Sequence, residues 1–185
     1  MTEEQQKAAF ATILKQSERL TNLIACIINY NEIDNKEIDA CEVDLSKLCR
    51  EMLAVLAPEA EQKGVTLIDA IEDNVTVLSS HELMSELAGN LIRNAIRYNK
   101  QGGSVTVSLN SSCLKVADTG IGIAKENMDK IFSRFFTVDK SHSGKNGGFG
   151  LGLAMVRKIC LRHGWDISVE SEEGKGSTFT VNFKA

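Results

Sequence analysis

The first thirty residues carry apolar side chains at spacings of three and four. These positions are Phe10, Ile13, Leu14, Leu20, Ile24, Ile27 and Ile28. Such spacing places them on one face of an α-helix over about 2–31, which at 1.5 Å per residue is roughly 40 Å long. A helix of this length must cover its apolar face with another helix, from this chain or from a partner. We therefore expect an element of a helical bundle or a dimer.

The rest of the chain alternates between helical and strand-like patterns. Helices are expected at about 45–64, 80–98 and 151–163, and strands at about 65–71, 74–78, 104–109, 113–118, 167–170 and 177–183. Residues 110–112 form a hairpin turn between two of these strands. The order of elements predicts an α+β fold, a two-layer sandwich with helices on one face of a mixed sheet. The chain thus divides into a long helix over 1–38 and a sandwich domain over 39–185.

Composition narrows the class of partner. The 185 residues are 43% apolar and 25% charged, which suits an ordinary globular core. The net charge of −4 argues against a broad nucleic-acid surface, which needs a basic face, but it leaves room for a local cationic pocket. The longest apolar run, residues 23–28, is far shorter than the ~20 residues that cross a bilayer, and the polar residues 1–7 are unlike a signal peptide.

The cysteines indicate a reducing compartment. Cys26, Cys41, Cys49, Cys113 and Cys160 are odd in number and widely spaced, with no CxxC pair. Disulfide frameworks and zinc sites both need tighter, even clusters. We interpret all five as free thiols of a protein that works inside the cell.

Two asparagines, Asn90 and Asn94, lie four residues apart in the segment 90–98. On a helix they share one face, so both amides converge on one site. An amide oxygen is a hard ligand that suits Mg²⁺, which keeps several waters and bridges to substrate phosphates. Paired helical asparagines are more often solvated surface, so this interpretation depends on the neighbouring motifs.

The segment 118–123, Asp-Thr-Gly-Ile-Gly-Ile, directly follows a predicted strand. An ionised Asp118 carboxylate accepts hydrogen bonds, so inside a pocket it could read the exocyclic amine of adenine. Gly120 and Gly122 let the backbone pass close to a flat base. An Asx-type turn that ends a strand explains the same residues in isolation.

Three of the seven phenylalanines, Phe132, Phe135 and Phe136, lie in the segment 131–139. We interpret them chiefly as core packing that holds a loop. Arg134 has a different interpretation, because a guanidinium beside a glycine-rich loop can stabilise charge on a transferring phosphoryl group.

Five of the 14 glycines lie between 144 and 152, at the start of a predicted helix. Backbone amides freed by glycine at the positive end of a helix dipole form a phosphate cradle. The polar run 140–146 has the character of a lid over a nucleotide.

Together, these motifs resemble the ATP-binding motifs of the histidine kinase, Hsp90, gyrase and MutL superfamily. The segments 131–139, 147–153 and 164–183 resemble those of sensor histidine kinases of two-component systems, and 13–31 is similar to the second helix of their dimerisation hairpin. The resemblance implies a Bergerat-type ATP-binding sandwich, ATP and Mg²⁺ as cofactors, and transfer of the γ-phosphoryl group to a histidine. It also implies a response regulator as partner, a homodimer through a helical bundle in the intact protein, and a cytoplasmic location with membrane contact only through regions outside this chain.

Individual roles follow from position in these motifs. The resemblance assigns magnesium to Asn94 with Asn90, the phosphates to Arg97, and the adenine to Tyr98 and Asp118. We expect catalytic roles for Asn94 and Arg134. Gly120, Gly122, Gly150 and Gly152 match the family's glycines, and we expect these four, with Gly148 and Leu151, to contact the nucleotide. Three positions depart from the family pattern, namely Asn99, Thr137 and Trp165; they put the details of phosphate contact in doubt.

The family's phosphate-accepting histidine is followed by an acidic residue and then a proline. His81 precedes Glu82, but no proline follows, and it begins the helix of the two asparagines, so we expect only a helix-start role. His163 is interpreted as structural and His142 as a polar loop residue. We therefore expect the acceptor to lie upstream of this chain.

Two other functions stay open. One is a nucleotide-binding regulatory module without productive transfer, against which the intact Asn94, Asp118 and glycines argue. The other is a dimerisation module built on the N-terminal helix, whose behaviour would not depend on Asp118. An ATPase with conformational clamping would need larger additional domains.

Overall fold

The computed structural model describes residues 2–35, 41–137 and 148–183. The chain clusters into two compact units, Met1–Lys36 and Glu37–Ala185.

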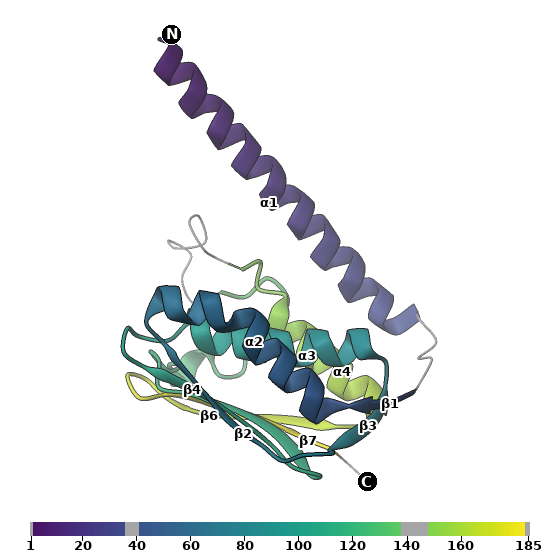
Figure 1. Ribbon diagram of the computed structural model, residues 1–185. Helices are drawn as coiled ribbons and strands as arrows, with labels where there is room; N and C mark the ends of the chain where they lie inside the picture. Colours follow the sequence, from purple (N-terminus) through teal and green to yellow (C-terminus); the bar gives the residue numbers. More distant parts are fainter. Residues whose placement is uncertain (1, 36–40, 138–147, 184–185) are drawn as a thin grey trace. The chain divides into compact units, whose positions relative to one another are not determined.

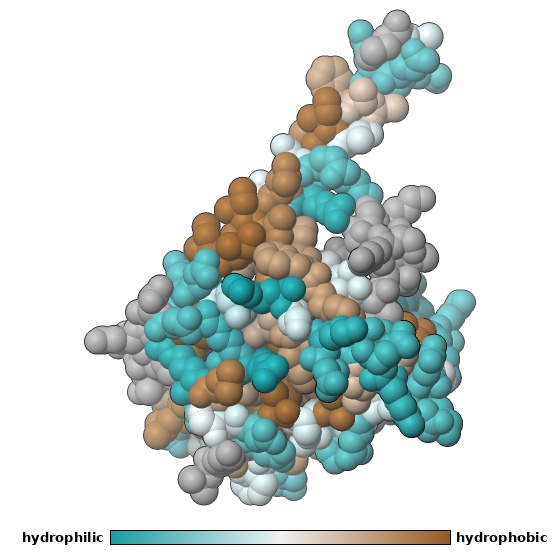
Figure 2. Space-filling model, turned by 180° about the vertical axis from the view of Figure 1, so that it is seen from behind, coloured by the Kyte–Doolittle hydropathy of each residue, from teal (hydrophilic) through white to brown (hydrophobic). Residues whose placement is uncertain are grey.

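The first unit contains one helix, α1 (Glu3–Asn35), which confirms the predicted helix and extends it by about a turn. It begins with reciprocal hydrogen bonds, because the Thr2 amide donates to Gln5 Oε1 at 2.9 Å and the Gln5 amide donates to Thr2 Oγ1 at 3.4 Å. Figure 2 shows apolar side chains gathered along α1. The side chains of Phe10, Ile13, Leu14, Leu20, Ile24 and Ile28 are at least half exposed. Within residues 2–35, the helix is the only element, so its unit provides nothing to cover this face.

The second unit follows the predicted order of elements. Its elements are β1 (Cys41–Asp44), α2 (Leu45–Lys63), β2 (Thr66–Ile71), β3 (Thr76–Ser79), α3 (His81–Arg97), β4 (Ser104–Leu109), β5 (Cys113–Asp118), the 3₁₀ helix η1 (Lys125–Asn127), α4 (Gly152–His163), β6 (Asp166–Glu172) and β7 (Gly176–Asn182). The predicted helices and strands are confirmed, and their ends agree to within two residues. The short elements β1 and η1 were not predicted.

The sheet of the second unit has five strands in the order β2-β4-β5-β7-β6. The β2–β4 pair is parallel and the other three pairs are antiparallel, so the sheet is mixed, as predicted. Helices α2, α3 and α4 cover one face of this sheet (Figure 1). A separate antiparallel pair, β1 and β3, lies outside the main sheet. This arrangement confirms the two-layer α+β sandwich.

The core lies between the sheet and the central helix α3. Strand β4 buries every second residue, Val105, Val107 and Leu109, and leaves the residues between them partly exposed. Helix α3 buries Leu87 and Leu91 completely or nearly so, and it packs against both α2 and α4. Because α3 is held on both sides, the residues on its remaining face have fixed positions.

Candidate functional site

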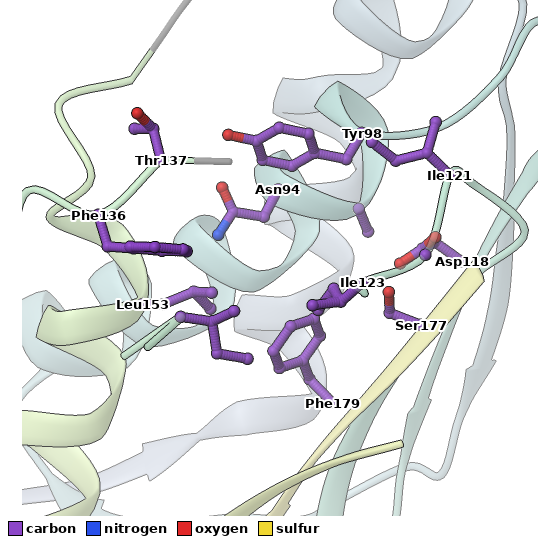
Figure 3. A pocket seen from close by; sticks show the side chains of 13 residues that line it. Asn94, Tyr98, Asp118, Ile121, Ile123, Phe136, Thr137, Leu153, Ser177 and Phe179 are labelled. Atoms are coloured by element: carbon purple, nitrogen blue, oxygen red, sulfur yellow. The ribbon is translucent and has the colours of Figure 1, made fainter. Parts of the chain in front are cut away.

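One pocket opens beside the central helix, with about 600 Å³ of empty space that is partly open to solvent. Its walls come from α3, the loop after β5, the segment 131–137, the start of α4, and β7. The residues that line it are Asn94, Ala95, Tyr98, Asp118, Ile121, Gly122, Ile123, Ile131, Phe136, Thr137, Leu153, Ser177 and Phe179. Figure 3 shows Asp118 and Ser177 at one end of the pocket and Phe136 and Thr137 at the other. A mostly apolar pocket with a few polar groups is typical of a small-molecule site.

The Asp118 carboxylate is the acidic group of this pocket. Burial raises its pKa above the ordinary value, and hydrogen bonds from the backbone amides of Gly120 and Ser177 oppose that shift. The Gly120 amide donates to Asp118 Oδ1 at 2.8 Å, which fixes the carboxylate as the side chain of a tight turn. Asp118 therefore both closes the turn after β5 and lines the pocket, so the two interpretations offered from the sequence hold together. A partly buried carboxylate of this kind can recognise a ligand that presents N–H groups.

The loop after Asp118 is held by backbone contacts on both sides. The Ile121 amide donates to the Tyr98 carbonyl oxygen at 3.0 Å, which joins the loop to the end of α3. A β-carbon on Gly120 would collide with that same carbonyl, and one on Gly122 would collide with the Glu172 carbonyl. Gly122 also has φ +68°, which favours glycine. These glycines are thus required by neighbouring backbone, a reason that the sequence did not reveal.

The two asparagines lie one turn apart on α3, as predicted, but only Asn94 lines the pocket. Asn90 Nδ2 donates to the Glu86 carbonyl at 2.8 Å and to Glu86 Oε2 at 3.2 Å. This leaves Asn90 Oδ1 directed toward the start of α4, where a β-carbon on Gly152 would lie 2.9 Å from it. In the described parts of the chain, no three His, Cys, Asp or Glu side chains form a metal-binding group. A cation here would need amide oxygens completed by water and ligand oxygens, which suits Mg²⁺.

Positive charge gathers where α3 ends. A β-carbon on Gly148 would collide with the Arg97 guanidinium, so Arg97 lies against the backbone of the glycine segment. The Lys63 ammonium donates to the Arg97 carbonyl oxygen. Burial lowers the pKa of Lys63, and the neighbouring Arg97 charge lowers it further. Arg97 beside the glycine segment, with Lys63 at the end of α3, suits an anionic ligand group.

The phenylalanine segment is attached to the glycine segment by a backbone hydrogen bond. The Phe135 amide donates to the Gly150 carbonyl oxygen at 2.9 Å, and Gly150 has φ +68° with no room for a β-carbon beside Phe136. Phe136 lines the pocket, whereas Phe132 packs edge-on against Phe179 with ring centroids 6.4 Å apart. The predicted packing role is confirmed for Phe132 and is wrong for Phe135, which is 58% exposed.

Some predicted residues lie apart from the pocket or outside the described residues. Arg134 is exposed and does not line the pocket, so its catalytic role stays a prediction. Leu151 is buried and caps α4, with its carbonyl accepting from the Met155 amide at 2.8 Å. The predicted lid 140–146, with His142, and Gly147 lie outside the described residues.

The other histidines have structural positions, as predicted. His81 is the first residue of α3. His163 places Nε2 2.9 Å from Ser79 Oγ and Nδ1 2.8 Å from the Ile159 carbonyl oxygen, and its ring stacks on Trp165 at 4.5 Å. Trp165, which departs from the family pattern, is buried in this cluster.

Several residues of the site were given no role from the sequence, although some lie within the motifs. They are Lys63, Glu86, Ile123, Leu153, Ser171, Ser177 and Phe179. Ser177 and Phe179 alternate on β7 and so face the same side of the sheet. That alternation was the available signal, but it does not reveal that β7 lies beside Asp118.

Comparisons with known proteins identify the family of this chain. Residues 80–185 match the family described as histidine kinase-, DNA gyrase B-, and HSP90-like ATPase. The chain is 32% identical over 176 residues to the sensor-like histidine kinase SenX3 of Mycolicibacterium smegmatis, covering 92% of this chain and 46% of SenX3. It is 33% identical over 195 residues to the aerobic respiration control sensor protein ArcB of Escherichia coli, covering 100% of this chain and 25% of ArcB. It therefore spans less than half of the length of these two curated relatives.

Among solved structures, full-length ShkA in complex with AMPPNP has a TM-score of 0.79 and 26% identity, covering 99% of this chain and 39% of that chain. In the described residues, no helix is both long enough and apolar enough to span a membrane.

Proposed function

Because the chain belongs to the histidine kinase-, DNA gyrase B- and HSP90-like ATPase family, we propose that its pocket binds Mg-ATP and serves a protein-histidine kinase. The γ-phosphoryl group would pass to a histidine outside this chain and then to an aspartate of a response regulator. The observation that carries this proposal is that Asn94, Tyr98 and Asp118, from two separate motifs, line one pocket.

The chain's own residues fit the two ends of a nucleotide. Asp118 would accept a hydrogen bond from the adenine amine, while Ile121, Ile123 and Phe179 provide apolar walls for the base. Asn94, with Asn90 one turn earlier, would hold magnesium through amide oxygens. When bound, the ion would neutralise charge on the phosphates.

The remaining contacts would position the phosphates. Arg97 lies against Gly148, and the amides that begin α4 at Gly152 are free of helical partners, so both can attract anionic oxygens. Transfer breaks the bond between the γ-phosphorus and the bridging oxygen and forms a bond from phosphorus to an imidazole nitrogen, and ADP leaves. Positioning and charge stabilisation supply most of the catalysis in such reactions, and we assign part of that stabilisation to Arg134.

We assign residues 1–38 to the second helix of a dimerisation hairpin and 39–185 to the catalytic domain. The exposed apolar face of α1 supports this assignment, because a homodimeric bundle in the intact protein would cover it. We further propose a cytoplasmic location for this region.

Calorimetry of Mg-ATP binding, with and without magnesium, tests the pocket. The unaltered chain should bind in a magnesium-dependent manner, and Asp118→Asn should not bind. Asp73→Asn makes the same chemical change on an exposed carboxylate paired with Arg50 at 2.8 Å, so it should bind normally. No binding by the unaltered chain would contradict the proposal.

Transfer needs a second assay, with γ-labelled ATP and an added acceptor-helix domain from a histidine kinase. Label on the acceptor histidine would support the kinase function. ATP binding without any transfer would favour the regulatory module instead.

A further inference from the structure

The hydroxyl group of Ser171, on β6, joins three segments near the pocket. Its Oγ accepts from the Ile123 amide at 2.8 Å, donates to the Gly176 carbonyl at 2.9 Å, and lies 2.9 Å from Ser177 Oγ. Ile123 and Ser177 both line the pocket, whereas Ser171 does not. Ser171 therefore acts on the pocket through its neighbours.

Counting protons fixes the direction of the bond between the two serines. A hydroxyl group has one proton to donate and two lone pairs. Ser171 uses its proton on the Gly176 carbonyl, so toward Ser177 it offers a lone pair. The bond of 2.9 Å then requires that Ser177 donates its own proton to Ser171.

This direction determines what Ser177 offers to a ligand. With its proton committed to Ser171, the Ser177 hydroxyl group has only its two lone pairs left, so toward a ligand it can only accept a hydrogen bond. Ser177 is 6% exposed and is paired with Asp118 in the β5–β7 ladder, so it lies beside a second group that accepts (Figure 3). This end of the pocket presents acceptors alone.

We propose that Ser171 is a positioning residue for base selection: it holds the Ser177 proton away from the pocket, so that the end beside Asp118 favours a 6-amino purine over a 6-oxo purine. The proposal rests on the proposed nucleotide site. An oxygen at position 6 would face the lone pairs of two acceptors, whereas an amine would donate to them.

The surrounding hairpin keeps this arrangement in place. The Gly174 amide donates to the Ile121 carbonyl oxygen at 2.7 Å, so the turn between β6 and β7 is attached directly to the loop after Asp118. Ser171 and Ser177 also face each other in the β6–β7 register. The two hydroxyl oxygens are therefore held close together, and reversing the bond between them would cost the bond from Ser171 to the Gly176 carbonyl oxygen.

The test compares the dissociation constants of ATP and inosine triphosphate, in which an oxygen replaces the 6-amine. In the unaltered chain, inosine triphosphate should bind at least about tenfold more weakly than ATP. Ser171→Ala frees the Ser177 proton to donate into the pocket, so the ratio of the two constants should fall by about three- to tenfold.

Three further variants separate this role from a structural one. Ser171→Thr keeps the hydroxyl group and should keep the ratio, and Ser168→Ala, at an exposed serine of the same strand, should also keep it. In a Ser177→Ala background, Ser171→Ala should leave the ratio unchanged, because no hydroxyl proton remains to be redirected. Melting curves establish that each variant folds, and Ser171→Cys, a poor donor of similar size, replaces Ser171→Ala if that variant does not fold.

The outcomes are distinct. Equal weakening of both nucleotides by Ser171→Ala would show a structural role alone and overturn the proposal, as would an effect on the ratio that persists without Ser177. If the unaltered chain bound neither nucleotide, the proposed function itself would fail. If it bound ATP with an unchanged ratio in Ser171→Ala, only the inference about Ser171 would fail.

Discussion

A β-carbon on Gly152 would lie 2.9 Å from Oδ1 of Asn90, so the first residue of α4 directly abuts a side chain of α3. The Asn90 amide nitrogen is held by Glu86 on its other side. The position of Asn90 Oδ1 is therefore set by two features: the hydrogen bonds from the same amide group to Glu86, and the space left because Gly152 has no side chain.

Gly152→Ala should disturb that oxygen without unfolding the domain. The added methyl group must displace Asn90 Oδ1, and we expect Mg-ATP binding to weaken by about tenfold or more, as when the support of a metal ligand is removed. Calorimetry at several magnesium concentrations measures the effect.

The matched control is Gly89→Ala, one residue before Asn90 on α3. A β-carbon there meets only Met52 Sδ, at 3.7 Å, which is ordinary contact. This variant should gain up to about 1 kcal/mol in stability from helix propensity and bind normally. Equal binding by both variants would contradict the role of Gly152.

Asp118→Asn should leave the nucleotide-free protein at least as stable at neutral pH. Burial raises the pKa of Asp118, so the folded state binds this proton more tightly than the unfolded state. That contribution to stability is complete below the ordinary pKa and is lost as pH rises through the raised value. At neutral pH the charged carboxylate therefore lowers the stability of the folded state. Asparagine is uncharged, so it removes this effect, and its side-chain oxygen can still accept the hydrogen bond from the Gly120 amide.

Denaturant titrations of both proteins from acidic to neutral pH measure this difference, which should grow as pH rises. ATP affinity of the unaltered chain should move in the opposite sense and weaken as pH falls and Asp118 becomes protonated. A marked loss of stability in Asp118→Asn at neutral pH would show that the carboxylate supports the fold.

Gly122→Ala and Gly174→Ala should lower the free energy of unfolding by different amounts. Both residues nevertheless have a left-handed backbone, with φ +68° and +82°. Both variants lose about 1–2 kcal/mol from that conformation. Only Gly122 also abuts a backbone carbonyl, that of Glu172, whereas Gly174 has open space around it. Urea unfolding should show a larger loss for Gly122→Ala, and equal losses would mean that the loop shifts freely.

Buried and exposed thiols should differ in how fast they react when the folded protein is treated with iodoacetamide near neutral pH. Burial raises the pKa of Cys49 and of Cys160 to about 12, so both remain protonated and unreactive. Cys41 is exposed and should react first. Peptide mass spectrometry identifies the labelled sites, with the denatured chain as the control in which all five react. Rapid labelling of Cys160 in the folded protein would contradict its burial.

Local periodicity explains most of the correct predictions. Helix α3 was evident because its apolar residues recur at helical spacing, and β4 because its apolar residues alternate with polar ones. The four-residue strand β1 is too short to show such a pattern, and the 3₁₀ helix η1 buries none of its residues.

Long-range pairing explains most of what the sequence could not reveal. Nothing local indicates that β2 is parallel to β4, or that Ser177 lies beside Asp118, because such pairs join residues far apart in the chain. The convergence of Asn94 and Asp118 was predicted only through motif resemblance. The role of Ser171 was not predicted because it depends on partners in β7 and in the distant loop after Asp118, which only the folded structure brings together.

The place of β7 in the sheet has a consequence for how the chain is made. This strand is the last of those described in chain order, yet it lies inside the sheet, between β5 and β6. While the protein leaves the ribosome, β5 and β6 both lack the strand that they share as a partner until residues 176–182 have emerged. One wall of the pocket, with Ser177 and Phe179, is also absent until then. The pocket is therefore incomplete before translation has passed β7, and a ribosome that stalls earlier leaves the strand edges that β7 would pair open to aggregation.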